Sequence, residues 1–102
     1  MNERRTAIRI KVDVAARYRR DGEFSERVAR IDNISRNGLL LVAEEAVPEG
    51  TQLRIAFEGQ DGAPHAIVGE VVRAAPMGAM GVSFVHVEET TLRYVREALG
   101  VP

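Results

Sequence analysis

The sequence contains no cysteine and no tryptophan, and aromatic residues make up only 5% of its 102 residues. Without cysteine the chain forms neither a disulfide nor a zinc site with thiolate ligands, and we expect it to work in the cytoplasm. No apolar run is long enough to span a bilayer, and the polar, cationic N-terminus is not followed by an apolar segment. The sequence therefore predicts neither membrane insertion nor a signal peptide.

Lysine is almost absent as well, because Lys11 stands alone against 13 arginines. A codon preference for arginine would explain that ratio, but it would not explain where the charges lie. Residues 1–36 carry ten cationic and six anionic side chains (net +4), whereas residues 37–102 carry four and nine (net −5). Arginine presents a planar fork that suits carboxylates, phosphates and guanine edges. The concentration of arginine in the first third therefore favours an anionic ligand there.

Alternating apolar and polar residues predict a series of short strands. In the first of them Ile10, Val12 and Val14 recur with a period of two, the pattern of a half-buried strand. Turn-forming residues recur near positions 22, 38, 50, 61 and 78, and they separate predicted strands at 10–18, 24–33, 39–42, 53–57, 66–74 and 80–84. Six strands at this spacing are typical of a small antiparallel barrel or sandwich.

Local features of the first strands carry further expectations. Asp21-Gly22 is expected to form a hairpin turn in which both residues have a positive φ. Val28 and Ile31 are out of phase with one another, which indicates a bulge or a change of face in the second strand.

The end of the chain has helical rather than strand periodicity. Leu92, Val95 and Leu99 recur at helical spacing, and Gly100 follows as a residue suited to end a helix. We therefore predict an all-β domain, a six-stranded antiparallel β-barrel with a C-terminal α-helix, that spans residues 1–102. Its expected parts are a flexible basic arm (1–9), the barrel (10–85) and the helix (88–99).

Signals of catalysis are weak. His65, in an expected turn, and His86, just after an expected strand, have no metal ligand or nucleophile at a diagnostic spacing, so we expect both to be structural or solvated. The carboxylates are scattered over turns and the final helix, and no glycine-rich loop leads into a Lys-Ser/Thr pair. The sequence therefore predicts no enzymatic activity, no cofactor and no metal site.

Two short stretches concentrate polar groups able to hold a ligand. The first is ERRTAIR, in which Arg5 and Arg9 are four residues apart and share one side in either a helix or a strand. The second is DNISRNG, in which Asn33 and Ser35 can shape a turn by local hydrogen bonds and Gly38 can adopt the positive φ that ends it. Taken separately, the first stretch is typical of a solvated basic tail and the second of a hairpin turn.

Taken together, the two stretches resemble the two-part signature of PilZ domains, RxxxR followed by (D/N)xSxxG. RTAIR supplies the first part and NISRNG the second, at the spacing of that family. GEVVRAAPMGAMGVSF, near the end of the chain, is similar to the family's late pair of strands. The resemblance covers about residues 3–98 and implies a stand-alone PilZ domain, whose fold is the six-stranded barrel derived above.

The resemblance implies a receptor for the bacterial second messenger cyclic di-GMP, which changes conformation on binding and relays the signal to a downstream protein partner. The ligand-binding residues that it implies are Arg4, Arg5, Arg9, Asn33, Ser35 and Gly38. Arg4 directly precedes the motif and resembles the type of residue that accepts a stacked pair of ligands. Two molecules of cyclic di-GMP per chain are therefore expected.

Two other functions remain open on the sequence. A PilZ-like adaptor would act by protein contact without binding nucleotide, although this chain keeps the arginine motif. A barrel for single-stranded nucleic acid would need aromatic side chains along a basic groove. The few aromatic residues and the acidic remainder of the chain do not favour that function, so no DNA or RNA partner is expected.

Overall fold

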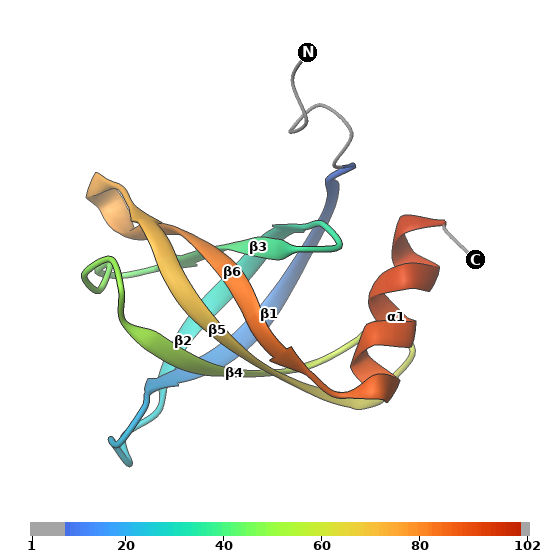
Figure 1. Ribbon diagram of the computed structural model, residues 1–102, viewed down its shortest axis with the longest axis horizontal. Coiled ribbons are helices and arrows are strands. Elements are labelled where there is room, and N and C mark those ends of the chain that lie inside the picture. The colour runs from blue at the N-terminus through green and yellow to red at the C-terminus, as the bar shows by residue number, and fades with distance from the viewer. Residues whose placement is uncertain (1–7, 101–102) are drawn as a thin grey trace.

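The computed structural model describes residues 8–100, which form a closed barrel of six antiparallel strands with one helix beside it (Figure 1). The order of strands around the barrel is β1-β2-β3-β6-β5-β4. The elements are β1 (Ile10–Arg20), β2 (Arg27–Ile34), β3 (Gly38–Ala43), β4 (Gln52–Glu58), β5 (Pro64–Ala74), the short 3-10 helix η2 (Pro76–Gly78), β6 (Ala79–Val87) and α1 (Glu89–Leu99). The predicted fold class is confirmed.

The interior of the barrel is filled by side chains that alternate along the strands. In β4, Leu53, Ile55 and Phe57 point inward and are buried, whereas the residues between them are exposed. Burying a side chain of this size stabilises the fold by about 1.5–3 kcal/mol. The most completely buried apolar side chains come from β2 to β6 and from α1: Ile31, Ile34, Leu39, Leu41, Leu53, Ile55, Ile67, Val71, Met80 and Val95.

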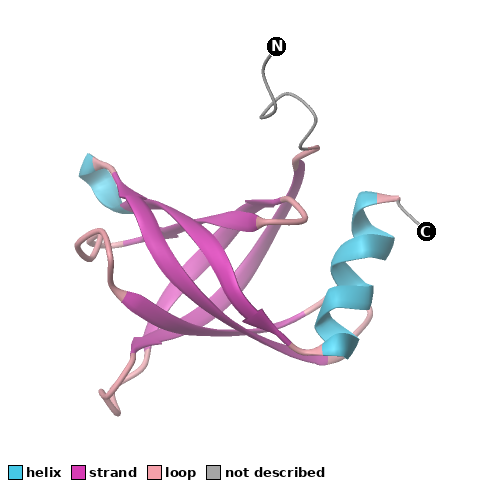
Figure 2. Ribbon diagram, in the orientation of Figure 1, coloured by secondary structure: helices cyan, strands magenta, loops and turns pink. Residues whose placement is uncertain are grey.

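The two ends of the barrel carry different parts of the chain. Figure 2 shows the start of β1, the turn between β2 and β3, and α1 at one end, which we call the entry end. The connection between β1 and β2, the loop between β3 and β4, and η2 lie at the other end, which we call the far end. The residues of the second sequence stretch, 32–38, therefore lie at the entry end, close to where the first stretch joins β1.

Two bulges, one in β1 and one in β2, interrupt the strand pairing near the entry end. In β1 the register with β2 shifts between Lys11 and Val14, where Asp13 has a φ of 54°. In β2 the register with β3 shifts between Ile31 and Asn33, so that Asp32 is the additional residue. The bulge that the sequence indicates in the second strand is therefore at Asp32, four residues after Val28. Val28 itself pairs regularly with β1, points outward and is 77% exposed.

Two of the expected turn geometries are wrong. Asp21-Gly22 does not have two positive φ angles, because Gly22 has a φ of 89° and that of Asp21 is not positive. The amide of Glu23 donates to the carbonyl of Arg20 over 3.0 Å, which together with Gly22 is the pattern of a type II turn. Gly38 does not have a positive φ either, and it is close packing against β6 rather than backbone conformation that requires this glycine.

Helix α1 is attached to the barrel through a buried histidine. His65 lies in β5, not in a turn as expected, and its side chain is buried. Its Nδ1 lies 2.9 Å from Thr91 Oγ1, its Nε2 lies 3.1 Å from Asp61 Oδ2, and its ring stacks on Tyr94 with 4.5 Å between ring centroids. A Cβ at Gly59 would lie 2.7 Å from the Tyr94 ring, so the glycine allows this ring to approach. The structural role expected for His65 is therefore that of a link between β5 and α1.

The helical face expected from the sequence is correct in part. Val95 is fully buried and Leu99 packs against the core, but Leu92 is only half-buried, and Thr91 and Tyr94 complete the buried face. Gly100 ends the helix in the left-handed conformation, with a φ of 74°. Within residues 8–100, no helix has the length and apolar character required to cross a bilayer.

Candidate functional site

The structure joins the two sequence stretches through a direct side-chain contact at the entry end. Arg9 precedes β1, and its Nη1 donates a hydrogen bond to Oδ1 of Asn33, which lies 24 residues later in β2. The contact follows from strand pairing, because Ile10 lies opposite Ile34 and Lys11 lies opposite Asn33. Arg4 and Arg5 lie outside the described residues.

Asn33 is held from its other side by a charged pair that the sequence analysis did not identify. Its Nδ2 donates to Oδ2 of Asp32 over 3.1 Å, and the ammonium group of Lys11 contacts Oδ1 of the same carboxylate at 3.2 Å. Each oxygen of Asp32 thus has one partner. The arrangement fixes the orientation of the Asn33 amide, with its carbonyl oxygen toward Arg9 and its NH2 group toward Asp32.

The electrostatics of this network keep Asp32 charged. The hydrogen bond from Asn33, followed by that from Lys11, holds the pKa of the Asp32 carboxyl below its usual range. The neighbouring carboxylate of Asp13 does not compete for Lys11, because Arg30 binds it through Nη2 at 2.6 Å and Nε at 3.0 Å. The ammonium group of Lys11 is therefore available for its ion pair with Asp32.

Ser35 shapes the turn between β2 and β3. It is buried, its amide donates to the carbonyl of Gly38 over 2.8 Å, and its hydroxyl donates to the same oxygen over 3.2 Å. The amide of Asn37 in turn donates to Ser35 Oγ over 3.4 Å. The hydroxyl thus closes the turn from inside, while the side chains of Arg36 and Asn37 are exposed at its tip.

Gly38 is required by close packing between β3 and β6. A Cβ at this position would lie 2.2 Å from the carbonyl oxygen of Val82, a separation that real atoms do not adopt. The carbonyl of Asn37 also accepts a hydrogen bond from the amide of Phe84 over 2.9 Å. The turn is therefore clamped against β6, and it holds the end of β2, including Asn33, in a fixed position.

The arrangement as a whole suits an anionic ligand with hydrogen-bonding edges. Asp13 and Arg30 compensate one another, so Arg9, Lys11, Arg36 and Asp32 leave the described part of the site with a formal charge of +2. A guanidinium group donates in a planar fork to phosphate oxygens or to guanine O6 and N7. The Asn33 amide donates to Asp32 through its NH2 group and accepts from Arg9 through its oxygen. An amide of this kind can offer both a donor and an acceptor to a base edge.

Protonation of Asp32 is expected to break this network. Because the folded-state pKa is lowered, the carboxylate stabilises the arrangement above the usual aspartate range, and that contribution is lost as the pH falls through the lowered folded pKa. We expect the side-chain amide signals of Asn33 in NMR spectra to stay constant from pH 8 to about pH 5 and to shift below about pH 4. In an Asp32→Ala variant this shift should disappear. If it persisted, the titrating group would not be Asp32.

Comparisons with known proteins identify the family and the fold. A family model described as PilZ domain matches residues 3–100. A search of curated proteins found no match. Two similar solved structures are a PilZ domain of CeSA from a cellulose-synthesising bacterium (TM-score 0.70, 13% identity, 91% of this chain and 95% of that chain) and the PilZ domain of YcgR from Escherichia coli with c-di-GMP (TM-score 0.70, 18% identity, 95% and 89%).

A third similar structure is longer than this chain. The PlzA protein of Borreliella burgdorferi in complex with c-di-GMP has a TM-score of 0.72 and 16% identity, and the match covers 90% of this chain but 39% of PlzA. At these identities the structural matches establish the fold. The family model spans nearly the whole chain, including both sequence stretches that the structure brings together.

Proposed function

The chain belongs to the PilZ domain family, and on that premise we propose that it is a cytoplasmic receptor for cyclic di-GMP. The observation that carries the proposal is the contact between Arg9 and Asn33, because it unites the arginine stretch and the polar turn in one site. Two solved structures of similar fold, the PilZ domain of YcgR and the PlzA protein, contain c-di-GMP, which supports the same ligand here.

The chemistry of the ligand fits the described side chains. Cyclic di-GMP carries two phosphodiester charges and two guanines, and the site offers a formal charge of +2 with a guanidinium fork at Arg9. In the proposed complex Arg9, together with Arg5, binds phosphate oxygens and guanine edges. Asn33 binds a guanine edge, while Ser35 and Gly38 hold the turn that presents Asn33.

Lys11 and Asp32 are positioning residues in this proposal. They hold the NH2 group of Asn33, so that its carbonyl oxygen faces Arg9 before the ligand arrives. A site whose donors and acceptors are already oriented loses less conformational entropy on binding. The nucleotide would replace the Arg9–Asn33 hydrogen bond, while the Asp32–Asn33 hydrogen bond would be kept.

The relay is proposed to involve residues 3–9. On binding, this segment closes over the nucleotide and converts ligand concentration into a new surface for a protein partner. The measurement is amide hydrogen exchange of residues 3–10 with and without cyclic di-GMP. Stronger protection with ligand is expected, and equal protection in both states would contradict the relay.

We propose that each chain binds two stacked molecules of cyclic di-GMP, with the guanidinium of Arg4 stacked on a guanine face. Isothermal titration calorimetry of the full chain should then saturate at two ligands per chain. An Arg4→Leu variant is expected to bind one ligand per chain and to keep its fold. Saturation of the wild-type chain at one ligand would overturn this stoichiometry without affecting the assignment of the site.

A further inference from the structure

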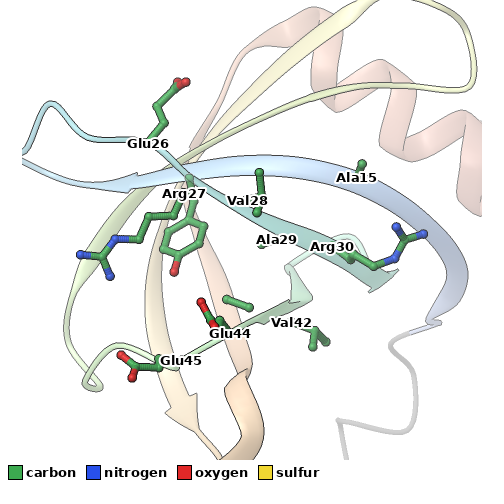
Figure 3. Close-up of a pocket in the computed structure, with 11 residues that line it drawn as sticks. Ala15, Glu26, Arg27, Val28, Ala29, Arg30, Val42, Glu44 and Glu45 are labelled. Carbon is green, nitrogen blue, oxygen red and sulfur yellow. The ribbon is translucent and has the colours of Figure 1, made fainter.

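A groove of about 820 Å³ lies at the far end of the barrel, where β2 and β3 separate (Figure 3). The pairing of these strands ends at Ala29 opposite Ala43. Beyond that point β2 pairs with β1 alone, through Val28 opposite Arg17. The first residues of β2 therefore have a strand on one side and the groove on the other. A strand edge of this kind is a template on which another extended segment can pair.

The groove combines an apolar lining with an acidic rim. Val28 is 77% exposed although it is a large apolar side chain, and Val42 and Ala29 continue the apolar lining. Figure 3 shows Glu26, which directly precedes β2, on one side of the groove and Glu44 and Glu45 on the other. An exposed apolar patch with a polar rim is a common mark of a protein interaction site.

The charge of the groove is negative. Arg30 lines one end, but Asp13 already binds its guanidinium at 2.6 Å and 3.0 Å, so that its charge is compensated. Arg27 then remains against three glutamates, which leaves a formal charge of −2 along the lining. An occupant that complements this groove carries cationic side chains next to small apolar ones.

We propose that this groove docks an extended, cationic segment of a partner protein. Small apolar side chains of the segment lie on Val28 and its neighbours, and alternate arginine or lysine side chains lie against Glu26, Glu44 and Glu45. The occupant is thus defined by alternation of cationic and apolar residues.

The groove is separate from the proposed nucleotide site, although both lie on β2. Val28 and Asn33 are five residues apart along the strand, or about 17 Å. A partner and a nucleotide can therefore bind at the same time, and the strand joins the two sites. The inference rests on the proposed function in one respect, namely that the docked segment belongs to the partner that receives the signal.

The test uses three nine-residue synthetic peptides and the full chain without nucleotide. The peptides alternate Arg with Val, Glu with Val, or Arg with Ser, and binding is followed by NMR chemical shifts and by fluorescence anisotropy. We expect the Arg/Val peptide to bind about tenfold more tightly than either of the others and to shift the amides of residues 26–30 and 42–45. Equal binding of the Arg/Ser peptide, or shifts confined to other residues, would overturn the proposal.

Variants separate the groove from general charge attraction. The exposed pair Glu44→Lys and Glu45→Lys should weaken the Arg/Val peptide about tenfold, whereas the equally charged control pair Glu70→Lys and Glu97→Lys, away from the groove, should not. Equal losses in both pairs would contradict docking in the groove. A parallel titration of the same chain with cyclic di-GMP keeps the two proposals distinct. If the chain binds the Arg/Val peptide but not cyclic di-GMP, the result contradicts the receptor function alone.

Discussion

An Arg9→Ala chain is expected to bind cyclic di-GMP at least about 100-fold more weakly than the wild type, with an unchanged melting temperature. The Arg9 side chain is exposed, and its described hydrogen bond goes to Asn33 rather than to the core. Charge-assisted hydrogen bonds are worth about 1.5–3 kcal/mol each, and the proposed complex uses at least two from this guanidinium. Losing two of them corresponds to about 100-fold or more in affinity.

The matched control is Arg93→Ala, which removes an exposed arginine of α1. It changes the net charge of the chain by the same amount but leaves the entry-end network untouched. Isothermal titration calorimetry of both variants and the wild type gives the affinities, and thermal unfolding gives the stabilities. Binding by Arg9→Ala within about threefold of wild type, or equal losses in both variants, would contradict a specific role for Arg9.

Gly38→Ala is expected to lower the free energy of unfolding by about 2–4 kcal/mol. The added Cβ would lie 2.2 Å from the carbonyl oxygen of Val82, and a backbone atom of β6 has no rotamer that moves it away. The strands β3 and β6 would have to separate at the end of the barrel that holds Asn33. In a chain of this size each kcal/mol lowers the melting temperature by roughly 4–8 °C.

Gly62→Ala provides the comparison for this prediction. Gly62 has a φ of 76°, but a Cβ there would meet no atom within 4 Å. The substitution therefore costs only the backbone strain of about 1–2 kcal/mol. Urea unfolding of both variants decides the question. If Gly38→Ala were as stable as Gly62→Ala but failed to bind nucleotide, the glycine would serve ligand approach rather than strand packing.

The sequence predicts the barrel well because its period-two pattern is strong. Leu53, Ile55 and Phe57 alternate with polar residues, and turn-forming residues separate six such runs. The helix is predicted from its own spacing of three to four residues, although that spacing places Leu92 rather than Tyr94 on the buried face. Tyr94 is buried through its stacking on His65 and its approach to Gly59, which are tertiary contacts that no local pattern reveals.

The sequence identifies the motif residues of the candidate site, whose ligand-binding role is a proposal, but not their supporting contacts. The two-part signature identifies Arg9, Asn33, Ser35 and Gly38. The contact between Lys11 and Asp32 instead depends on two bulges, which no turn-forming residue marks in the sequence. A bulge shifts the register by one residue, and it brings the ammonium group of Lys11 to within 3.2 Å of the Asp32 carboxylate.

Gly38 shows a further limit of reading a sequence by local conformation. A glycine after asparagine at a turn suggests a positive φ, and Gly38 has none. Its small size is required by β6, which is more than forty residues later in the sequence. Close approach of two strands is decided by the pairing of the whole barrel, so a local reading identifies the residue without its physical reason.

The most direct test of a cyclic di-GMP site at the entry end is an NMR titration of the isotope-labelled full chain with that nucleotide. We predict saturable shifts of the Asn33 side-chain amide and of the amides of residues 9–11 and 35–38, with no comparable change in the presence of linear diguanylate at the same concentration. The Arg9→Ala chain should show none of these shifts. If the wild-type spectrum stays unchanged, or if the shifts arise elsewhere on the barrel, the chain does not bind cyclic di-GMP at Arg9 and Asn33.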